Sequence, residues 1–201
     1  SGGRDFGVFK TADEACDAAA KAFQQLRGQG VEARRRIVEI VKSLCEDNAE
    51  EWGRIELKET KIGRLDHKIE KLQIIRNVPG VEWLRPDGLS GDHGITLEEY
   101  TPFGVVGAVT PSTHSIPTLA GNIVNIVAAG NAVVFNAHPA ASRCAALVVR
   151  KFNEAIHRAI GIENIATIIE QPTLESFGEM CANENVRLLC VTGGPGVVDA
   201  A

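Results

Sequence analysis

The chain has 201 residues, of which 44% are hydrophobic and 23% are charged, so it can bury the core of one domain or of two small ones. Its 26 acidic and 21 basic residues give a net charge of −5, which argues against the phosphate backbone of a nucleic acid as the main partner. No stretch approaches the roughly 18 uninterrupted apolar residues of a membrane span, so we expect a soluble, cytoplasmic protein without a membrane partner.

The N-terminal segment has the spacing of amphipathic helices. Residues 11–48 predict two of them. The first begins with a capping box, in which Thr11 is followed three residues later by Glu14. Gly28 and Gly30 are expected to end this first helix, and the second follows directly.

Two further helical segments are expected over residues 49–60 and 65–76. Residues 79–94 are rich in Gly, Pro and Asp and predict an irregular connector. Residues 95–100 alternate weakly and are expected to form a short strand of their own.

From residue 104 onward, strand and helix patterns alternate. The expected strands are 104–110, 132–136, 165–170 and 187–192, and the expected helices are 117–129, 142–159 and 174–183. Such alternation is typical of right-handed βαβ units on a parallel sheet. The predicted fold class is α/β, with a helical N-terminal part (1–94) and a Rossmann-like parallel sheet with flanking helices (95–201). Because only four strands precede the end of the chain, we expect the sheet to be incomplete at the C-terminus.

Small and polar residues follow three of the expected strands. The three clusters are Thr110-Pro111-Ser112-Thr113-His114, Asn136-Ala137-His138-Pro139 and Thr192-Gly193-Gly194-Pro195. Ligands of parallel sheets bind outside the carboxyl ends of the strands. Glycine lets the backbone approach a ligand closely, and a helix N-terminus attracts phosphate. The candidate site is therefore this edge of the sheet.

Each cluster also has a purely structural interpretation. Ser115 is expected to cap the helix that follows the first cluster. Asn136 and His138 are then polar loop residues, and Gly193-Gly194 is a tight turn without a ligand. The residues alone leave these alternatives open.

The five cysteines are scattered, without Cys-x-x-Cys spacing, and predict reduced thiols rather than disulfides or a metal site. They are Cys16, Cys45, Cys144, Cys181 and Cys190, with Cys190 expected in a buried strand. The five histidines also lack metal-binding spacing, so we expect no metal site.

Taken together, the motifs resemble the aldehyde dehydrogenase superfamily, over nearly the whole chain. They are Gly104-Val105-Val106-Gly107 with Thr110-Pro111-Ser112-Thr113, the run AAGNAVVFN ending at Asn136, and the run VTGGPGVV ending at Val198. In the helical part, Glu59-Thr60 followed by Gly63 and Asp66 also matches the family pattern. Within the superfamily they look like the CoA-acylating branch, the propionaldehyde and acetaldehyde dehydrogenases of bacterial microcompartments.

The resemblance implies a defined chemistry. In this branch a cysteine thiolate attacks the aldehyde, hydride passes to NAD+, and the resulting thioester is transferred to CoA. The chain would then be the cofactor-binding part of such an enzyme, with the nucleophilic cysteine in a catalytic domain outside these residues. NAD and coenzyme A are the implied cofactors and a small aldehyde the implied substrate. The implied assembly is a homo-oligomer, located inside a microcompartment and in contact with its shell.

The resemblance also assigns residues to the site. Its cofactor-binding residues are Thr110, Pro111, Ser112, Thr113, Asn136, His138, Pro139, Thr192, Gly193 and Gly194. His114 stands where the family has an amide side chain that stabilises the oxyanion. An imidazole N–H can donate as well, so His114 is the candidate oxyanion donor.

Two alternative functions remain. A hydrolytic NAD(P)-dependent aldehyde dehydrogenase is disfavoured, because such enzymes carry a Lys where Asn136 stands and a Glu near Pro139. A non-catalytic nucleotide-binding or assembly module, complete at 201 residues, would keep the fold without the chemistry.

Overall fold

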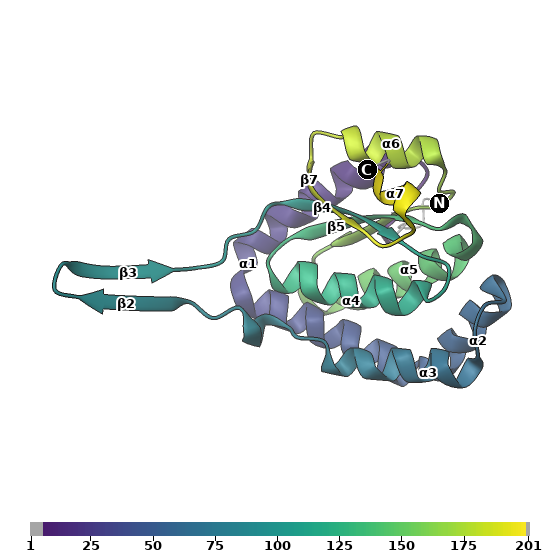
Figure 1. Ribbon diagram of the computed structural model, residues 1–201, viewed down its shortest axis with the longest axis horizontal. Helices are drawn as coiled ribbons and strands as arrows, with labels where there is room; N and C mark the ends of the chain where they lie inside the picture. The colour runs from purple at the N-terminus through teal and green to yellow at the C-terminus, as the bar shows by residue number, and fades with distance from the viewer. Residues whose placement is uncertain (1–5, 200–201) are drawn as a thin grey trace.

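The core of the protein is a five-stranded parallel sheet, seen in the computed structural model in Figure 1. The structure describes residues 6–199. The strand order is β1 (Val8–Phe9), β6 (Ala166–Ile169), β5 (Ala132–Ala137), β4 (Val105–Thr110) and β7 (Val186–Val191). Nearly all residues of the three central strands are buried, as expected for strands covered on both faces. The predicted α/β class and parallel sheet are confirmed.

The sheet has one strand more than the four expected from the sequence. This strand, β1, pairs in parallel with β6 at the edge of the sheet. The Asn153 side chain fixes the segment, because its Nδ2 donates to the Phe6 carbonyl at 3.2 Å and to the Ala166 carbonyl at 2.6 Å. Two residues are too few to show an alternating pattern, which is why the sequence does not predict β1.

Helices cover both faces of the sheet. In Figure 1, α4 (Ser115–Ala128) and α5 (Ser142–Ile160) lie below the strands, and α6 (Leu174–Ala182) and α7 (Pro195–Asp199) lie above them. The helix α6 begins with a capping box, in which the Thr173 side chain accepts from the third helical N–H. Each of these helices follows a strand, so each begins at the carboxyl edge of the sheet.

The long helix α1 spans Ala12–Asp47 and contains the predicted interruption. Gly30 has φ of 73° and ψ of −161°, so two helices meet there at a kink. Thr11 and Glu14 form the predicted capping box. The first part of α1 passes behind α6, and the second part runs beneath α4 (Figure 1).

The predicted helical segments after α1 are also confirmed. They form α2 (Ala49–Thr60) and α3 (Leu65–Gln73), and α3 continues into a 3-10 turn over Ile74–Asn77. The helix α3 packs against α1 and α4, and α2 packs against α3 and α5 (Figure 1).

The prediction of an irregular connector over residues 79–94 is wrong for the second half of this segment. After a short 3-10 turn at Val81–Trp83, β2 (Asp87–Gly91) pairs with β3 (Gly94–Glu98) in an antiparallel hairpin. The hairpin projects from the body of the protein (Figure 1), and all residues of both strands are exposed. Because no core contact requires an apolar face, β2 has no strand-like pattern. The hairpin crosses residue 94, and the predicted domain division there remains a prediction.

We expect Gly7→Ala to destabilise the protein, because β1 can reach the sheet only with glycine at this position. Gly7 has φ of +90°, and an added Cβ would overlap the Asn153 side-chain amide and lie 2.5 Å from the Ala166 carbonyl oxygen. Strain of this kind costs on the order of 1–3 kcal/mol. Urea denaturation should therefore show a loss of about 2 kcal/mol in the free energy of unfolding.

Gly28→Ala is the matched control. It lies in α1, and a Cβ there meets no atom within 4 Å. Alanine should raise the free energy of unfolding by about 0.5–1 kcal/mol. A Gly7→Ala variant as stable as the unsubstituted chain would contradict the position of β1.

Candidate functional site

A cleft of about 480 Å³ lies at the carboxyl ends of β4, β5 and β7. It brings together nine of the ten residues predicted to bind a cofactor. These are Thr110, Pro111, Ser112, Asn136, His138, Pro139, Thr192, Gly193 and Gly194. The parallel strands place their turns at the same edge of the sheet, so three clusters that are distant in sequence meet in one place.

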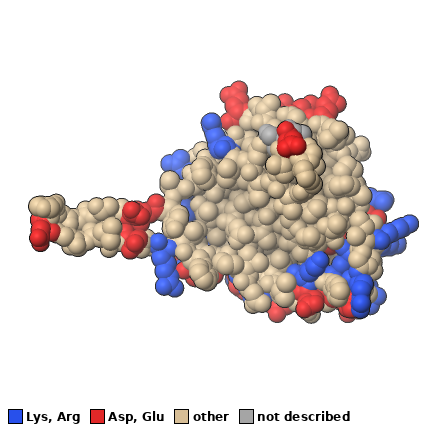
Figure 2. Space-filling model, in the orientation of Figure 1, with Lys and Arg blue, Asp and Glu red and all other residues tan. Residues whose placement is uncertain are grey.

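The cleft is uncharged. None of the described residues that line it is Lys, Arg, Asp or Glu. Its apolar walls are Val109, Ala137, Pro172, Leu174, Phe177 and Val197. Figure 2 shows that the surface around β7 and α7 is mostly uncharged, whereas lysine and arginine gather over α2 and α3. Apolar clefts with a few placed polar groups are the usual form of cofactor sites.

Asn136 is a fixed polar group in the cleft wall. Its Oδ1 accepts from Ser176 Oγ at 2.8 Å, and its Nδ2 donates to the Thr173 carbonyl at 3.5 Å. Ser176 and Thr173 also form the capping box of α6, so the start of α6 holds the amide in place. The alternative that Asn136 is a loop residue is wrong, because it lies buried within β5.

His138 follows β5 directly and caps the 3-10 turn Pro139–Ala141. Its Nδ1 accepts from the Ala140 N–H at 3.1 Å. The neutral ring therefore carries its proton on Nε2, which is the nitrogen left for a ligand.

The turn after β7 presents bare backbone to the cleft. The Thr192 N–H donates to the Val109 carbonyl at 3.1 Å, which continues the sheet one residue beyond β7. A Cβ added to Gly194 would meet no atom within 4 Å, so the backbone there borders open space. The helix α7 begins at Pro195, which suits the first position of a helix.

Thr110 adds a hydroxyl whose hydrogen bonds are not satisfied within the described chain. It ends β4 at the cleft, is buried, and its Oγ1 has no hydrogen-bond partner. A buried hydroxyl without a partner is costly, and a bound polar ligand would remove that cost.

Thr113 and His114 lie outside the cleft lining. His114 is the N-cap residue of α4, and its Nδ1 lies 3.0 Å from Thr113 Oγ1. Burial lowers the pKa of His114, as do the nearby ammonium groups of Lys71 and Lys68, although Glu56 opposes them. The imidazole is therefore neutral at pH 7 and has one N–H to donate. Its role as oxyanion donor remains a prediction.

The cap of α4 differs from the expected one. Ser115 does not cap the helix through its side chain, and its Oγ has no partner. Instead, the Ser115 N–H donates to Glu56 Oε1 at 2.7 Å. Glu56 belongs to α2, 59 residues earlier in the chain, so no local pattern reveals this cap.

A second carboxylate of α2 caps α5 in the same way. Glu59 accepts from the N–H groups of Arg143 at 2.9 Å and of Cys144 at 2.7 Å. Helix N-termini attract negative charge, and here the chain supplies it. The N-termini of α4 and α5 are therefore occupied by side chains and not free for a ligand phosphate.

The buried thiols are unsuited to nucleophilic attack. Burial raises the pKa of Cys16 and Cys45 to about 12 and also raises the pKa of Cys144. A nucleophilic cysteine needs its thiolate form at neutral pH. The expectation that Cys190 lies in a buried strand is wrong, because β7 is an edge strand and the residue is half-buried.

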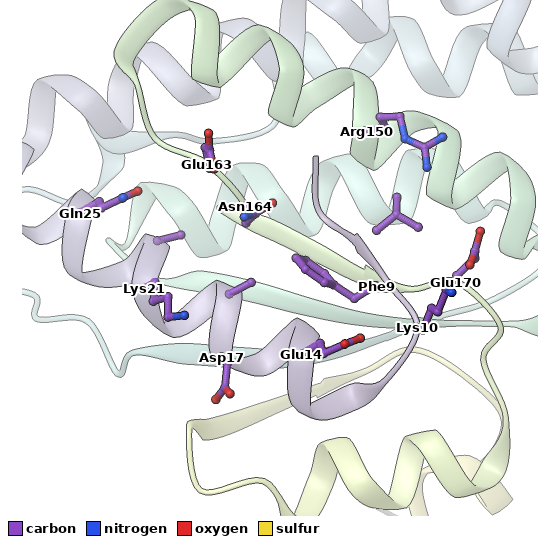
Figure 3. A pocket seen from close by; sticks show the side chains of 13 residues that line it. Phe9, Lys10, Glu14, Asp17, Lys21, Gln25, Arg150, Glu163, Asn164 and Glu170 are labelled. Carbon is purple, nitrogen blue, oxygen red and sulfur yellow. The ribbon is translucent and has the colours of Figure 1, made fainter. Parts of the chain in front are cut away.

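A larger cleft of about 700 Å³ lies along the edge strand β1, between α1 and α5 (Figure 3). Its charged side chains have both signs: Lys10, Lys21, Arg150, Glu14, Asp17, Glu163 and Glu170. None of the residues that the sequence predicts as functional lies there. Because the larger cleft runs beside the sheet rather than at the strand ends, the smaller cleft is the better candidate for the functional site.

Within residues 6–199, no group of three or more metal-ligating side chains could hold an ion. In the same range, no helix has both the length and the apolar character needed to cross a membrane.

The family of the protein follows from comparison with known proteins. The sequence model of the aldehyde dehydrogenase family matches residues 8–200. The chain therefore belongs to this family.

Among curated relatives, the acetaldehyde dehydrogenase (acetylating) EutE of Salmonella typhimurium is 39% identical over 98% of this chain. The chain spans only 42% of that relative's length. Among solved structures, propionaldehyde dehydrogenase of Rhodopseudomonas palustris with bound propionyl-CoA has a TM-score of 0.93 and 41% identity, over 96% of this chain and 44% of that one. A propionaldehyde dehydrogenase from the fucose utilisation microcompartment of Clostridium phytofermentans has a TM-score of 0.94 and 38% identity, over 97% and 45%.

We expect Cys16, Cys45 and Cys144 to resist alkylation by iodoacetamide at pH 8. A thiol with a pKa of about 12 is ionised to only about one part in 10⁴ at that pH, and burial also blocks access. Mass spectrometry of the labelled chain measures the modification at each site. Half-buried Cys190 serves as the internal reference, and all five thiols should react in denaturant. Rapid labelling of Cys144 in the folded chain would contradict its assigned environment.

Proposed function

We propose that the chain is the cofactor-binding part of an NAD-dependent, CoA-acylating aldehyde dehydrogenase. Such an enzyme converts an aldehyde, CoA and NAD+ into acyl-CoA and NADH. The observation that carries the proposal is the uncharged cleft in which three motif clusters meet at the carboxyl ends of the strands. The names of two relatives, an acetylating acetaldehyde dehydrogenase and a propionaldehyde dehydrogenase with bound propionyl-CoA, support it.

The cleft suits the adenosine half that NAD+ and CoA share. Pro139, Leu174 and Phe177 offer apolar contact to a purine, and Asn136 and His138 supply placed polar groups. NAD+ supplies the hydride acceptor of the reaction, and CoA supplies the acyl acceptor. The role of these side chains is to bind and orient the two molecules.

The phosphate groups of NAD+ and CoA need hydrogen-bond donors other than these side chains. Glu56 and Glu59 occupy the N-termini of α4 and α5, so those positions repel phosphate. The turn at Gly194 remains as a candidate phosphate position, because a Cβ added there would meet no atom within 4 Å. The unpartnered Thr110 hydroxyl lies in the same cleft and can bond to the ligand.

The oxyanion of the tetrahedral intermediate would be stabilised by His114. The neutral imidazole donates one N–H to the developing negative charge.

The lining of the cleft also favours the acylating reaction over a hydrolytic one. Hydrolytic members of the family bind the adenine ribose with a Lys and a Glu, and no charged residue is among the described residues of the lining. Asn136 stands where the Lys would be, and its amide is already bonded to α6.

We also propose that the protein is a homo-oligomer. The hairpin β2–β3 exposes Leu89, Ile95 and Leu97, although an isolated two-stranded hairpin is marginally stable in water. A second copy of the chain covering the hairpin would bury these side chains. A location inside a bacterial microcompartment, in contact with its shell, is supported by the likeness to the Clostridium phytofermentans enzyme.

With the complete gene product, NADH formation from acetaldehyde or propionaldehyde should require CoA. The reason is that the acyl group leaves the enzyme only by transfer to the CoA thiol. Absorbance at the NADH band, with and without CoA, measures this requirement. NADH formed at the same rate without CoA would reject the acylating function.

We expect Gly194→Val to weaken NAD+ binding at least about tenfold, because its side chain fills the open space beside the turn. Calorimetric titration of the complete gene product measures the dissociation constant. Gly178→Val is the matched control, since Gly178 lies in α6 outside the cleft lining and also has no neighbour within 4 Å. Equal affinity in both variants would show that the cofactor binds elsewhere.

A further inference from the structure

A buried ion pair joins α2 and α3 beneath the loop that follows β4. Lys68 Nζ donates to Glu56 Oε1 at 3.0 Å, and the two side chains are 3% and 0% exposed. Every other ion pair in the described part of the chain has at least one partner that is well exposed to solvent. The Glu56–Lys68 pair therefore differs in kind from the surface pairs.

Both members of the pair also bind the loop backbone. Glu56 Oε1 accepts from the Ser115 N–H at 2.7 Å, and Lys68 Nζ donates to the Thr113 carbonyl at 3.3 Å. His114 is the single residue between these two points. The pair therefore holds the main chain on both sides of the candidate oxyanion donor.

Stability alone does not explain this pair. A buried ion pair is seldom more stabilising than apolar residues of the same volume. Glu56 Oε2 is buried without a hydrogen-bond partner, which adds a further cost. Apolar side chains could fill the space, but they could neither accept from the Ser115 N–H nor donate to the Thr113 carbonyl. A hydrogen-bond acceptor is needed for the Ser115 N–H and a donor for the Thr113 carbonyl, and Glu56 and Lys68 supply them.

We propose that Glu56 and Lys68 are positioning residues that fix the orientation of His114. With both neighbours held, His114 keeps one backbone conformation, with φ of −153° and ψ of 68°. Thr113 Oγ1, 3.0 Å from Nδ1, then sets the ring. The structural part of this proposal stands on these contacts, and its consequence for turnover rests on the proposed function.

The chain offers a matched control. Glu59 lies one turn further along α2, is 12% exposed, and caps α5 instead of α4. Glu56→Gln and Glu59→Gln each remove one negative charge from a helix N-terminus. Only Glu56 contacts the loop around His114.

The first test is amide hydrogen exchange measured by NMR. In Glu56→Gln, hydrogen exchange at the Ser115 amide should accelerate about tenfold or more relative to the other amides of α4. The reason is that the bond from the Ser115 N–H to the Glu56 carboxylate is about twice as strong as a bond to a neutral amide oxygen. In Glu59→Gln, acceleration should appear at the Cys144 amide and not at Ser115. Unchanged relative exchange at Ser115 in Glu56→Gln would overturn the proposal.

If Glu56→Gln does not fold, the double variant Glu56→Gln with Lys68→Met keeps the test available. It removes both charges at nearly constant volume, which costs less than leaving one buried charge unpaired. The Ser115 amide should again exchange faster than the rest of α4. Exchange equal to that of the unsubstituted chain would overturn the proposal in this variant too.

The second test is kinetic and uses the complete gene product. A displaced His114 should lower kcat about 10- to 100-fold in Glu56→Gln while leaving the KM for NAD+ unchanged, because the cleft residues are untouched. Glu59→Gln should retain a higher kcat than Glu56→Gln. Faster Ser115 exchange with an unchanged kcat would support the positioning of the loop and reject the role of His114 in the proposed function.

Discussion

The common direction of β4, β5 and β7 is the constraint on which the rest of the structure depends. Since the strands are parallel, the turns that follow them meet at one edge, and three polar clusters form one cleft. The helices that begin at this edge bring positive N-termini with them. Two of these N-termini donate hydrogen bonds to carboxylates of α2, whereas the backbone at Gly194 borders open space. At this edge of the sheet, the N-termini of α4 and α5 are therefore closed to a ligand phosphate, and the turn after β7 is accessible to one.

The helical N-terminal part contacts the carboxyl edge of the sheet through its side chains. Glu56 and Glu59 come from α2, yet each binds backbone at the start of a helix in the α/β part. Lys68 of α3 adds a bond to the Thr113 carbonyl. The kinked helix α1 contacts the helices on both faces of the sheet, because it begins beside α6 and continues along α4. The predicted division near residue 94 separates two stretches of sequence that meet at the carboxyl edge of the sheet.

Local sequence patterns predicted the strongly periodic elements and the cleft, but not the long-range contacts. Buried apolar runs and turn residues suffice to place β4 and β5 and the clusters behind them. The two-residue strand β1 and the exposed, glycine-rich strand β2 have no such pattern. The expected cap through Ser115 is wrong because a carboxylate 59 residues away takes that role. Thr113 and His114 belong to a predicted cluster but lie outside the cleft lining, at the start of α4.

The central claim is that an adenosine-bearing molecule lies in the cleft at the strand ends. Titration of the isotope-labelled protein with CoA, followed by amide chemical shifts, tests it most directly. The account predicts that the largest shifts fall on the non-proline residues that line the cleft: Thr110, Ser112, Asn136, Ala137, His138, Thr192, Gly193 and Gly194. Shifts confined instead to the charged cleft along β1, around Lys10 and Arg150, would contradict it.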